Sequence, residues 1–362
     1  MADLLRADNV GSFLRPAYLT DALDRRADDA ELRQLEDRAV REVVALQEEL
    51  GMPVVTDGEF RRRVWYGTMT RITEGFDPER FERVYTDEQG RQDRHGGPVV
   101  VTPLERTRSQ VDFELAFLRE QTDRPVKITI PSPSHFLSYW TPGVSDRAYP
   151  DRQAFLDALI GLMHEDAVAL ANAGAAYLQI DAPKYTYFHD ERLYPDADRR
   201  AEQLAEYVRQ DARVLAGVEG VVTGLHICRG NYRGMYGSST PYEEFAEVLF
   251  READSYDRLL LEYDSVPAGG FEALRFVPDD TVAVLGLVST KTPELEDPDA
   301  LRRQIDEASR HLPLDLLAVS PQCGFASAYQ GNQVTVDDER RKLELVLRTA
   351  EDVWGGVGSP MP

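Results

Sequence analysis

The sequence predicts an α/β fold: a (β/α)8 TIM barrel with a hairpin or lid inserted after the second strand. Three observations favour this fold. Short apolar runs have the continuous hydrophobic character of strands in a buried parallel sheet. Each run precedes a stretch with helical periodicity, and this alternation is typical of a parallel sheet covered by helices. The chain of 362 residues fits one barrel with insertions, since such barrels have about 250 residues.

We expect strands, in chain order, at 10–16, 53–59, 126–131, 176–183, 221–228, 259–264, 281–290 and 316–319. We expect helices at 17–26, 31–50, 151–172, 198–216, 241–251, 271–276, 298–311 and 337–354. Gly51 and Gly174 follow two of these helices, where glycine is the usual C′ residue.

Residues 76–108 interrupt the alternation of strands and helices. Residues 87–90 and 95–98 have the composition of turns, and the run at 99–102 is β-branched, so we expect an inserted hairpin or lid. Residues 1–362 are therefore interpreted as a single catalytic barrel that contains this insertion.

The composition excludes several classes of partner. The net charge is −23, from 64 acidic and 41 basic residues, which argues against a nucleic acid or an anionic membrane as partner. No run approaches the roughly eighteen apolar residues of a membrane-spanning helix. The N-terminus lacks the apolar core of a signal peptide, and two cysteines suit a reducing compartment. We therefore expect a cytoplasmic protein.

A histidine and the two cysteines suggest a metal site. His226 and Cys228 are two residues apart in an expected strand, so their side chains share one face, although two core side chains would show the same spacing. Cys323 follows another strand. One histidine and two cysteines suit zinc. Glu262 comes after three leucines, where an unpaired charge costs several kcal/mol to bury, and it is the candidate fourth ligand.

In a (β/α)8 barrel the active site lies at the carboxyl ends of the strands. We therefore expect one rim to collect the polar residues that end these strands: Ser12, Glu59, Thr129, Asp181, His226, Cys228, Glu262, Ser289 and Cys323.

Taken together, the strand-end motifs resemble the catalytic barrel of cobalamin-independent methionine synthase, and more closely its short single-domain relatives. The motifs are Val10-Gly11-Ser12, Asp57-Gly58-Glu59, Gln179-Ile180-Asp181-Ala182-Pro183, His226-Ile227-Cys228, Leu261-Glu262 and Ser320-Pro321-Gln322-Cys323-Gly324. The resemblance covers nearly the whole chain.

The resemblance implies a site and a reaction. The zinc ligands would be His226, Cys228, Glu262 and Cys323, with Glu262 a replaceable ligand. The amino-acid thiol would lie against Ser12 and the backbone of Val10, with its ammonium held by Glu59 and Asp181. A free thiol is mostly protonated at neutral pH, and zinc removes that proton. The zinc-bound sulfur of homocysteine or a similar small thiol would then attack a methyl donor.

Two departures from the family pattern concern the methyl donor. The family carries a histidine at the end of the seventh strand for proton delivery. Here that region reads Leu287-Val288-Ser289-Thr290-Lys291, which makes Lys291 the nearest proton-carrying group and the candidate catalytic residue. The Asp-Glu-Pro of the fourth strand is Asp181-Ala182-Pro183, so a second carboxylate is missing.

Three functions stay open on this basis. The first is a zinc-dependent S-methyltransferase whose donor is methyl-tetrahydrofolate, a methyl-corrinoid protein or another small methyl compound. The second keeps zinc and thiol but performs another alkyl transfer, or cleavage of a carbon–sulfur bond, in a specialised pathway. The third is a zinc-stabilised barrel that binds or senses a ligand without catalysis. The sequence does not determine the oligomeric state.

Overall fold

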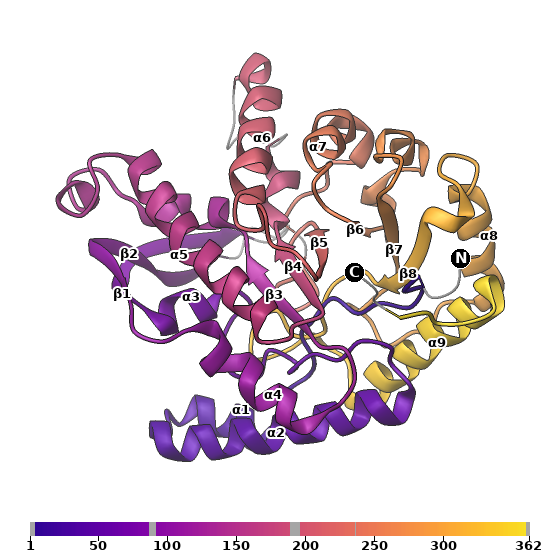
Figure 1. Ribbon diagram of the computed structural model, residues 1–362, viewed down its shortest axis with the longest axis horizontal. Helices are drawn as coiled ribbons and strands as arrows, with labels where there is room; N and C mark the ends of the chain where they lie inside the picture. Colours follow the sequence, from indigo (N-terminus) through magenta and orange to yellow (C-terminus); the bar gives the residue numbers. More distant parts are fainter. Residues whose placement is uncertain (1–3, 87–91, 189–195, 236, 360–362) are drawn as a thin grey trace.

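The central element is a sheet of six parallel strands in the order β3-β4-β5-β6-β7-β8 (Figure 1). The computed structural model describes residues 4–86, 92–188, 196–235 and 237–359, excluding the side chains of 78–97, 197 and 198. The strands are β3 (Lys127–Pro131), β4 (Tyr177–Asp181), β5 (Val222–Ile227), β6 (Arg258–Glu262), β7 (Val282–Val288) and β8 (Leu317–Pro321). All six lie within or close to the expected ranges, and every residue in them is buried.

The first two expected strands are reduced to single bridges at the two edges of this sheet. Ala7 forms a parallel bridge to Val319 of β8, and Val55 forms one to Val126, beside β3. The two segments also contact each other, because the Thr56 hydroxyl donates to the Gly11 carbonyl at 2.7 Å. They take the places of the first and second barrel strands.

The expected first strand at 10–16 is therefore wrong in position, because the bridge lies earlier in the chain. Gly11 has φ 137°, which interrupts an extended strand at this point. In the second segment Gly58 and Glu59 have φ of 68° and 59°, so the chain turns there instead of continuing as a strand.

A buried ionic cluster inside the barrel ties the N-terminal segment to the sheet. Lys127 Nζ lies 2.9 Å from Asp8 Oδ1 and donates to the Asn9 carbonyl at 2.5 Å. Arg258 Nε lies 3.3 Å from Asp8 Oδ2. Buried charges are tolerated when they are paired, so this cluster defines where residues 8 and 9 sit.

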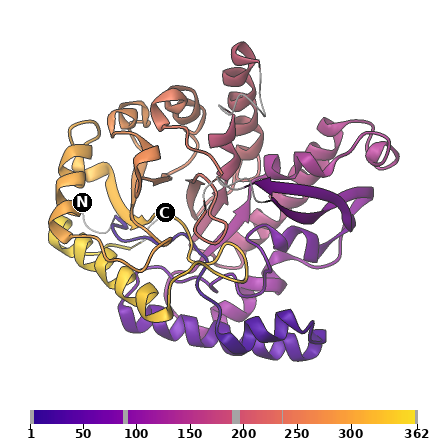
Figure 2. The ribbon, with the colours of Figure 1, turned by 180° about the vertical axis from the view of Figure 1, so that it is seen from behind.

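The helices cover the outside of the sheet (Figures 1 and 2). They are α1 (Ala17–Asp24), α2 (Asp29–Leu50), α3 (Gly67–Ile72), α4 (Ala116–Gln121), α5 (Arg152–Asn172), α6 (Ala197–Ala212), α7 (Ala246–Glu252), α8 (Pro298–Ala308) and α9 (Val336–Trp354). The helix expected at 271–276 is a 3₁₀ helix, Glu272–Phe276, and the first part of 241–251 is another, Tyr242–Glu244. The short helices α3 and α4 were not expected. Within the described residues, no helix has the length and apolar character needed to cross a membrane.

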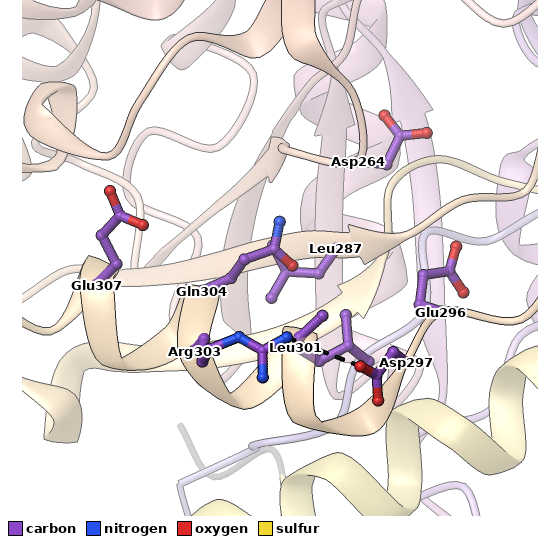
Figure 3. A pocket seen from close by; sticks show the side chains of 9 residues that line it. Asp264, Leu287, Glu296, Asp297, Leu301, Arg303, Gln304 and Glu307 are labelled. Carbon is purple, nitrogen blue, oxygen red and sulfur yellow. Dashed lines mark ion pairs between the residues drawn. The ribbon is translucent and has the colours of Figure 1, made fainter.

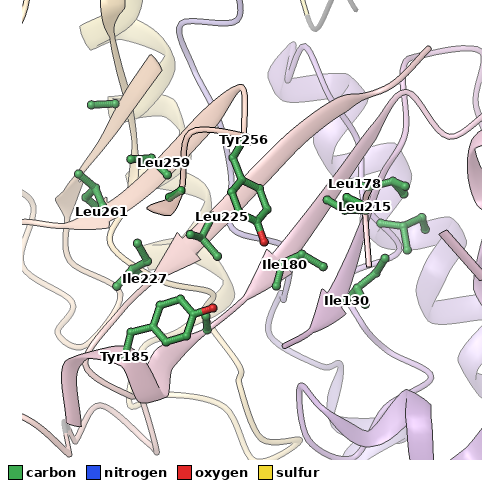
Figure 4. Packing of buried hydrophobic residues seen from close by; sticks show 14 of the residues in the cluster. Ile130, Leu178, Ile180, Tyr185, Leu215, Leu225, Ile227, Tyr256, Leu259 and Leu261 are labelled. Atoms are coloured by element: carbon green, nitrogen blue, oxygen red, sulfur yellow. The ribbon is translucent and has the colours of Figure 1, made fainter. Parts of the chain in front are cut away.

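Strand alternation separates the core from the site. Figure 4 shows the side chains of three neighbouring strands that pack in the main hydrophobic cluster: Leu178, Ile180, Leu225, Ile227, Leu259 and Leu261. Because successive side chains on a strand point to opposite faces, Asp181 and His226 point to the other side, into the barrel.

The expected insertion is an antiparallel hairpin of β1 (Thr73–Thr86) and β2 (Gln92–Arg106). Its position agrees with the expected range of 76–108, and it lies against α3 and α5 (Figure 2). The expected turn at 87–90 falls outside the described residues.

Candidate functional site

Three of the four expected metal ligands come together at the carboxyl end of the sheet. His226 belongs to β5, Cys228 follows it directly, and Cys323 lies two residues after β8. Their ligand atoms all lie within 4.8 Å of one another, and all three residues are buried. Parallel strands end at one edge of the sheet, which explains why residues 95 positions apart meet there.

Asp181 orients the histidine of this group. The parallel register places Asp181 of β4 directly opposite His226 of β5. Asp181 Oδ1 lies 2.9 Å from His226 Nδ1, and the same oxygen accepts from the Gln179 amide at 2.7 Å. The buried Nε2 atom has no hydrogen bond within the described part of the chain, which leaves it available for a metal. A carboxylate on the second nitrogen is the usual support of a metal-binding histidine.

The protonation of the three residues follows from their contacts. Burial alone would lower the pKa of His226, but the interactions with Asp181 and Cys323 raise it to about 10. The hydrogen bond from Cys228 lowers the pKa of Cys323 well below its usual range, although burial opposes this. The same contact and burial raise the pKa of Cys228. These directions favour the thiolate form at Cys323 and the thiol form at Cys228, and a bound divalent cation would displace the remaining protons.

Glu262, the expected fourth ligand, lies outside this group of three. Its Oε1 accepts from Lys291 Nζ at 2.6 Å, and its Oε2 accepts from the backbone N–H of Arg229 at 2.7 Å. Burial raises the pKa of Glu262 above its usual value, with Lys291 acting in the opposite direction. Its role as a metal ligand stays a prediction.

Lys291 is held between two carboxylates. Its Nζ also lies 3.2 Å from Asp264 Oδ1, and the Lys291 side chain is 11% exposed. Burial would lower the pKa of Lys291, but Glu262 and Asp264 raise it. Proton delivery by Lys291 stays a prediction, and this raised pKa makes the lysine a weak acid.

A cavity of about 540 Å³ lies between α8 and the ends of β6 and β7. Figure 3 shows its lining, which includes Asp264, Leu287 and Glu296 and, on the helix itself, Leu301, Arg303, Gln304 and Glu307. Asp264 borders this cavity on one side and contacts Lys291 through one of its oxygens.

The three metal-ligand candidates line a cavity of about 50 Å³. All four expected substrate-binding residues line the same cavity. The full lining is Val10, Ser12, Glu59, Trp65, Asp181, Pro183, His226, Cys228, Gly230, Asn231, Cys323, Gly324 and Ser327. The structure therefore brings the expected substrate-binding residues and three of the four expected metal ligands into one small space.

Glu59 lines this cavity and has one carboxylate oxygen without a hydrogen bond in the described part of the chain. Its Oε1 accepts from the Thr129 hydroxyl at 2.7 Å, and its buried Oε2 has no hydrogen-bond partner among the described residues. Burial raises the pKa of Glu59 to about 7, although Arg62 lowers it. Gly11 permits this approach, because a Cβ there would lie 3.0 Å from Glu59 Oε1 and 2.7 Å from Thr129 Cγ2.

Ser12 and Val10 also line this cavity. The Ser12 carbonyl accepts from Phe325 N at 2.9 Å, and the Val10 carbonyl accepts from the Gln179 amide at 2.8 Å. Gly324 must be glycine for this contact, since a Cβ would lie 2.0 Å from Ser12 Oγ. The Cys323 loop and the N-terminal segment are thus packed directly against each other.

Sequence reasoning missed Asn231 as a site residue. Its amide donates to the Gly324 carbonyl at 2.9 Å, and it helps lower the pKa of Cys323. Its one signal in the sequence is its position three residues after Cys228, in the loop that follows β5. Ser327 and Trp65 also line the cavity.

Comparisons with known proteins identify the family of this chain. Residues 9–337 match the family described as the catalytic domain of cobalamin-independent synthase. The chain is 35% identical to YxjG of Bacillus subtilis over 368 residues, covering 96% of this chain and 94% of that protein. It is 24% identical to the methionine synthase of Pyrococcus abyssi, covering 89% of this chain and 86% of that protein.

Among solved structures, the fold is similar to that of a B12-independent methionine synthase from Shewanella sp. W3-18-1 in complex with selenomethionine. The TM-score is 0.75 at 20% identity, with 97% of this chain and 98% of that chain covered. Because the family match extends over most of the chain, the protein belongs to the cobalamin-independent methionine synthase family.

Proposed function

We propose that this protein is a zinc-dependent S-methyltransferase that methylates a small amino-acid thiol, homocysteine or a close analogue. The single observation that carries the proposal is the shared cavity of His226, Cys228 and Cys323 with Glu59 and Ser12. The first three residues suit a thiophilic metal, and the other two suit an amino acid. Membership of a methyltransferase family supports the same reaction.

The residues present fit zinc. His226 Nε2 is buried without a hydrogen bond among the described residues, and the two cysteines supply soft ligands beside it. His226, Cys228 and Cys323 would hold the ion, with Glu262 as an exchangeable fourth ligand. When bound, zinc would lower the pKa of a substrate thiol so that the sulfur is present as a nucleophile at neutral pH.

The protein's own residues would orient the thiol. Glu59 Oε2, which has no described partner, would accept a hydrogen bond from the substrate ammonium. Asp181 lies on the same cavity and would contribute a second negative charge. Ser12 would contact the substrate carboxylate through its backbone N–H. The small size of the cavity would exclude water from the sulfur.

The cysteines also bear on where the protein works. Both Cys228 and Cys323 are free and buried next to each other. A pair of metal-binding thiols persists in a reducing environment, so we propose a cytoplasmic location.

A second candidate keeps the zinc and the thiol but changes the electrophile. Ser289, Thr290 and Lys291 stand where the family pattern has a histidine, and none of them is part of the described cavity lining. Thr290 is engaged with Gln322 at 2.8 Å, and Lys291 with Glu262. An electrophile whose leaving group needs no proton would suit this site, which favours another alkyl transfer or carbon–sulfur cleavage as the alternative.

The test is mass spectrometry of the zinc-loaded protein incubated with homocysteine and, separately, methyl-tetrahydrofolate, a methyl-corrinoid protein and other small methyl donors. We expect methionine with at least one donor, and no product after chelation or in Cys323→Ser. A thiol adduct of another mass would favour the alternative. Absence of any thiol product from zinc-loaded protein with every donor would contradict the proposal.

A further inference from the structure

Both carboxylate oxygens of Glu262 accept hydrogen bonds from groups other than the three clustered residues His226, Cys228 and Cys323. Lys291 Nζ holds Oε1 at 2.6 Å, and the Arg229 N–H holds Oε2 at 2.7 Å. The Glu262 side chain is 1% exposed, so no solvent competes for these contacts. Glu262 nevertheless ends β6 at the same rim as the clustered residues.

We propose that Lys291 is a positioning residue that gives the Glu262 carboxylate a second resting position, so that a substrate thiol can replace it at the metal. This inference rests on the proposed function. An exchangeable carboxylate ligand needs somewhere to go when it leaves, since an unpaired buried carboxylate is costly. The Lys291 ammonium and the Arg229 N–H form such a place.

Asp264 sets the strength of this resting position. It contacts Lys291 Nζ at 3.2 Å, so Glu262 and Asp264 share one cation. When the Asp264 charge is removed, Lys291 pairs with Glu262 only, and the Lys291–Glu262 ion pair becomes stronger. Removing the Lys291 charge has the opposite effect, because Glu262 then loses its cationic partner. Asp264 borders the 540 Å³ cavity, so an isosteric asparagine fits there.

These opposite effects define the experiment. We would compare wild type with Lys291→Met, Asp264→Asn and Lys291→Arg. Zinc affinity would be measured by competition with a chromophoric chelator, and metal-edge absorption would count the sulfur and oxygen neighbours of zinc during a homocysteine titration. Neither measurement depends on turnover or on a methyl donor. Far-UV circular dichroism would compare the folding of the variants.

The expected result is a shift in opposite directions. In Lys291→Met zinc binds roughly tenfold tighter, and about tenfold more homocysteine is needed to replace the Glu262 oxygen at zinc. A tenfold change corresponds to the loss of one charge-assisted hydrogen bond, here the one between Lys291 and Glu262. In Asp264→Asn zinc binds more weakly and less homocysteine is needed. Lys291→Arg keeps the charge and stays close to wild type.

Two different failures can be told apart. Wild-type protein that takes up no zinc, or whose zinc gains no sulfur neighbour from homocysteine, would contradict the proposed function itself. If wild-type protein takes up zinc and its zinc gains a sulfur neighbour, but the zinc affinity of Lys291→Met is unchanged or weaker, only the role of Lys291 is overturned. Shifts in the same direction for Lys291→Met and Asp264→Asn would also overturn it.

Discussion

The Asp181 carboxylate lies 2.9 Å from Nδ1 of His226, and the parallel register of β4 and β5 places the two residues opposite each other. The contact determines which histidine nitrogen faces the two cysteines. It also gives Asp181 a role that its position at a strand end did not reveal. Its expected contact with a substrate ammonium stays a prediction, and both roles use the same side chain.

Replacing this carboxylate should weaken metal binding. We expect Asp181→Asn to reduce zinc affinity by about 10 to 100-fold, because the support of a metal-binding histidine becomes neutral. Competition with a chromophoric chelator measures this change. Gln179→Met is the matched control, since it removes a neighbour of Asp181 but keeps the carboxylate on His226. Equal zinc affinity in Asp181→Asn and wild type would show that the contact does not serve the metal.

Glu59 should determine the preference for an amino-acid thiol. We expect Glu59→Gln to raise the KM for homocysteine by roughly tenfold or more, since a charge-assisted hydrogen bond to the ammonium is lost. The KM for 4-mercaptobutanoate, which lacks the amino group, should change much less. An equal rise for both thiols would contradict this recognition.

The raised pKa of Glu59 predicts that the affinity for homocysteine depends on pH. Burial raises the pKa of Glu59 to about 7, so its carboxylate becomes fully charged only above that pH. Homocysteine should therefore bind more tightly as pH rises through 7, provided that its ammonium stays protonated. A binding titration at pH 6 and pH 8 tests this, with Glu59→Gln as the variant in which the gain in affinity should be smaller, since only the release of the thiol proton then contributes to it.

The ionic cluster inside the barrel should matter for stability. In Lys127→Met the buried Asp8 carboxylate loses its partner at 2.9 Å and keeps only Arg258, whose Nε lies 3.3 Å away. Breaking a buried ion pair costs about 3 kcal/mol in free energy of unfolding. Denaturant titration measures the loss. The double variant Lys127→Met with Asp8→Asn should lose less than the sum of the two single variants, because each single variant already removes the Lys127–Asp8 interaction. Strict additivity would argue against this coupling.

Glu339 of α9 should make stability depend on pH. Burial raises its pKa from 4.5 to about 8, and the Leu14 N–H, at 2.8 Å from Oε2, only partly opposes this. The folded protein thus holds the proton more tightly than the unfolded chain. The stabilisation is fully present below pH 4.5 and is lost as pH rises through 8.

The matching variant is Glu339→Gln, which keeps an oxygen for Leu14 but cannot ionise. We expect the free energy of unfolding of wild type, but not of this variant, to fall between pH 6 and pH 9, by on the order of a few kcal/mol. Parallel curves for the two proteins would show that Glu339 does not titrate in this range.

Much of the site was predictable because its pattern is local. Strand alternation put His226 and Cys228 on one face, and the strand-end rule brought Cys323, Ser12, Glu59 and Asp181 to the same rim. The hairpin followed from turn residues and a β-branched run. None of these inferences needs the distance between two remote side chains.

The remaining features depend on such distances. The bridges at Ala7 and Val55 replace two expected strands because backbone turns at Gly11 and Gly58 interrupt them. Asp181 pairs with His226 because of the strand register, and Glu262 pairs with Lys291 rather than joining the cluster.

The sequence by itself determined the barrel class, the insertion and several of the residues at the rim, since hydrophobic periodicity and turn chemistry act over a few neighbouring residues. Only the tertiary structure decided which of the buried charges pair with one another. The energy of a buried charge depends on the groups within a few ångströms of it, and those groups come from distant parts of the chain.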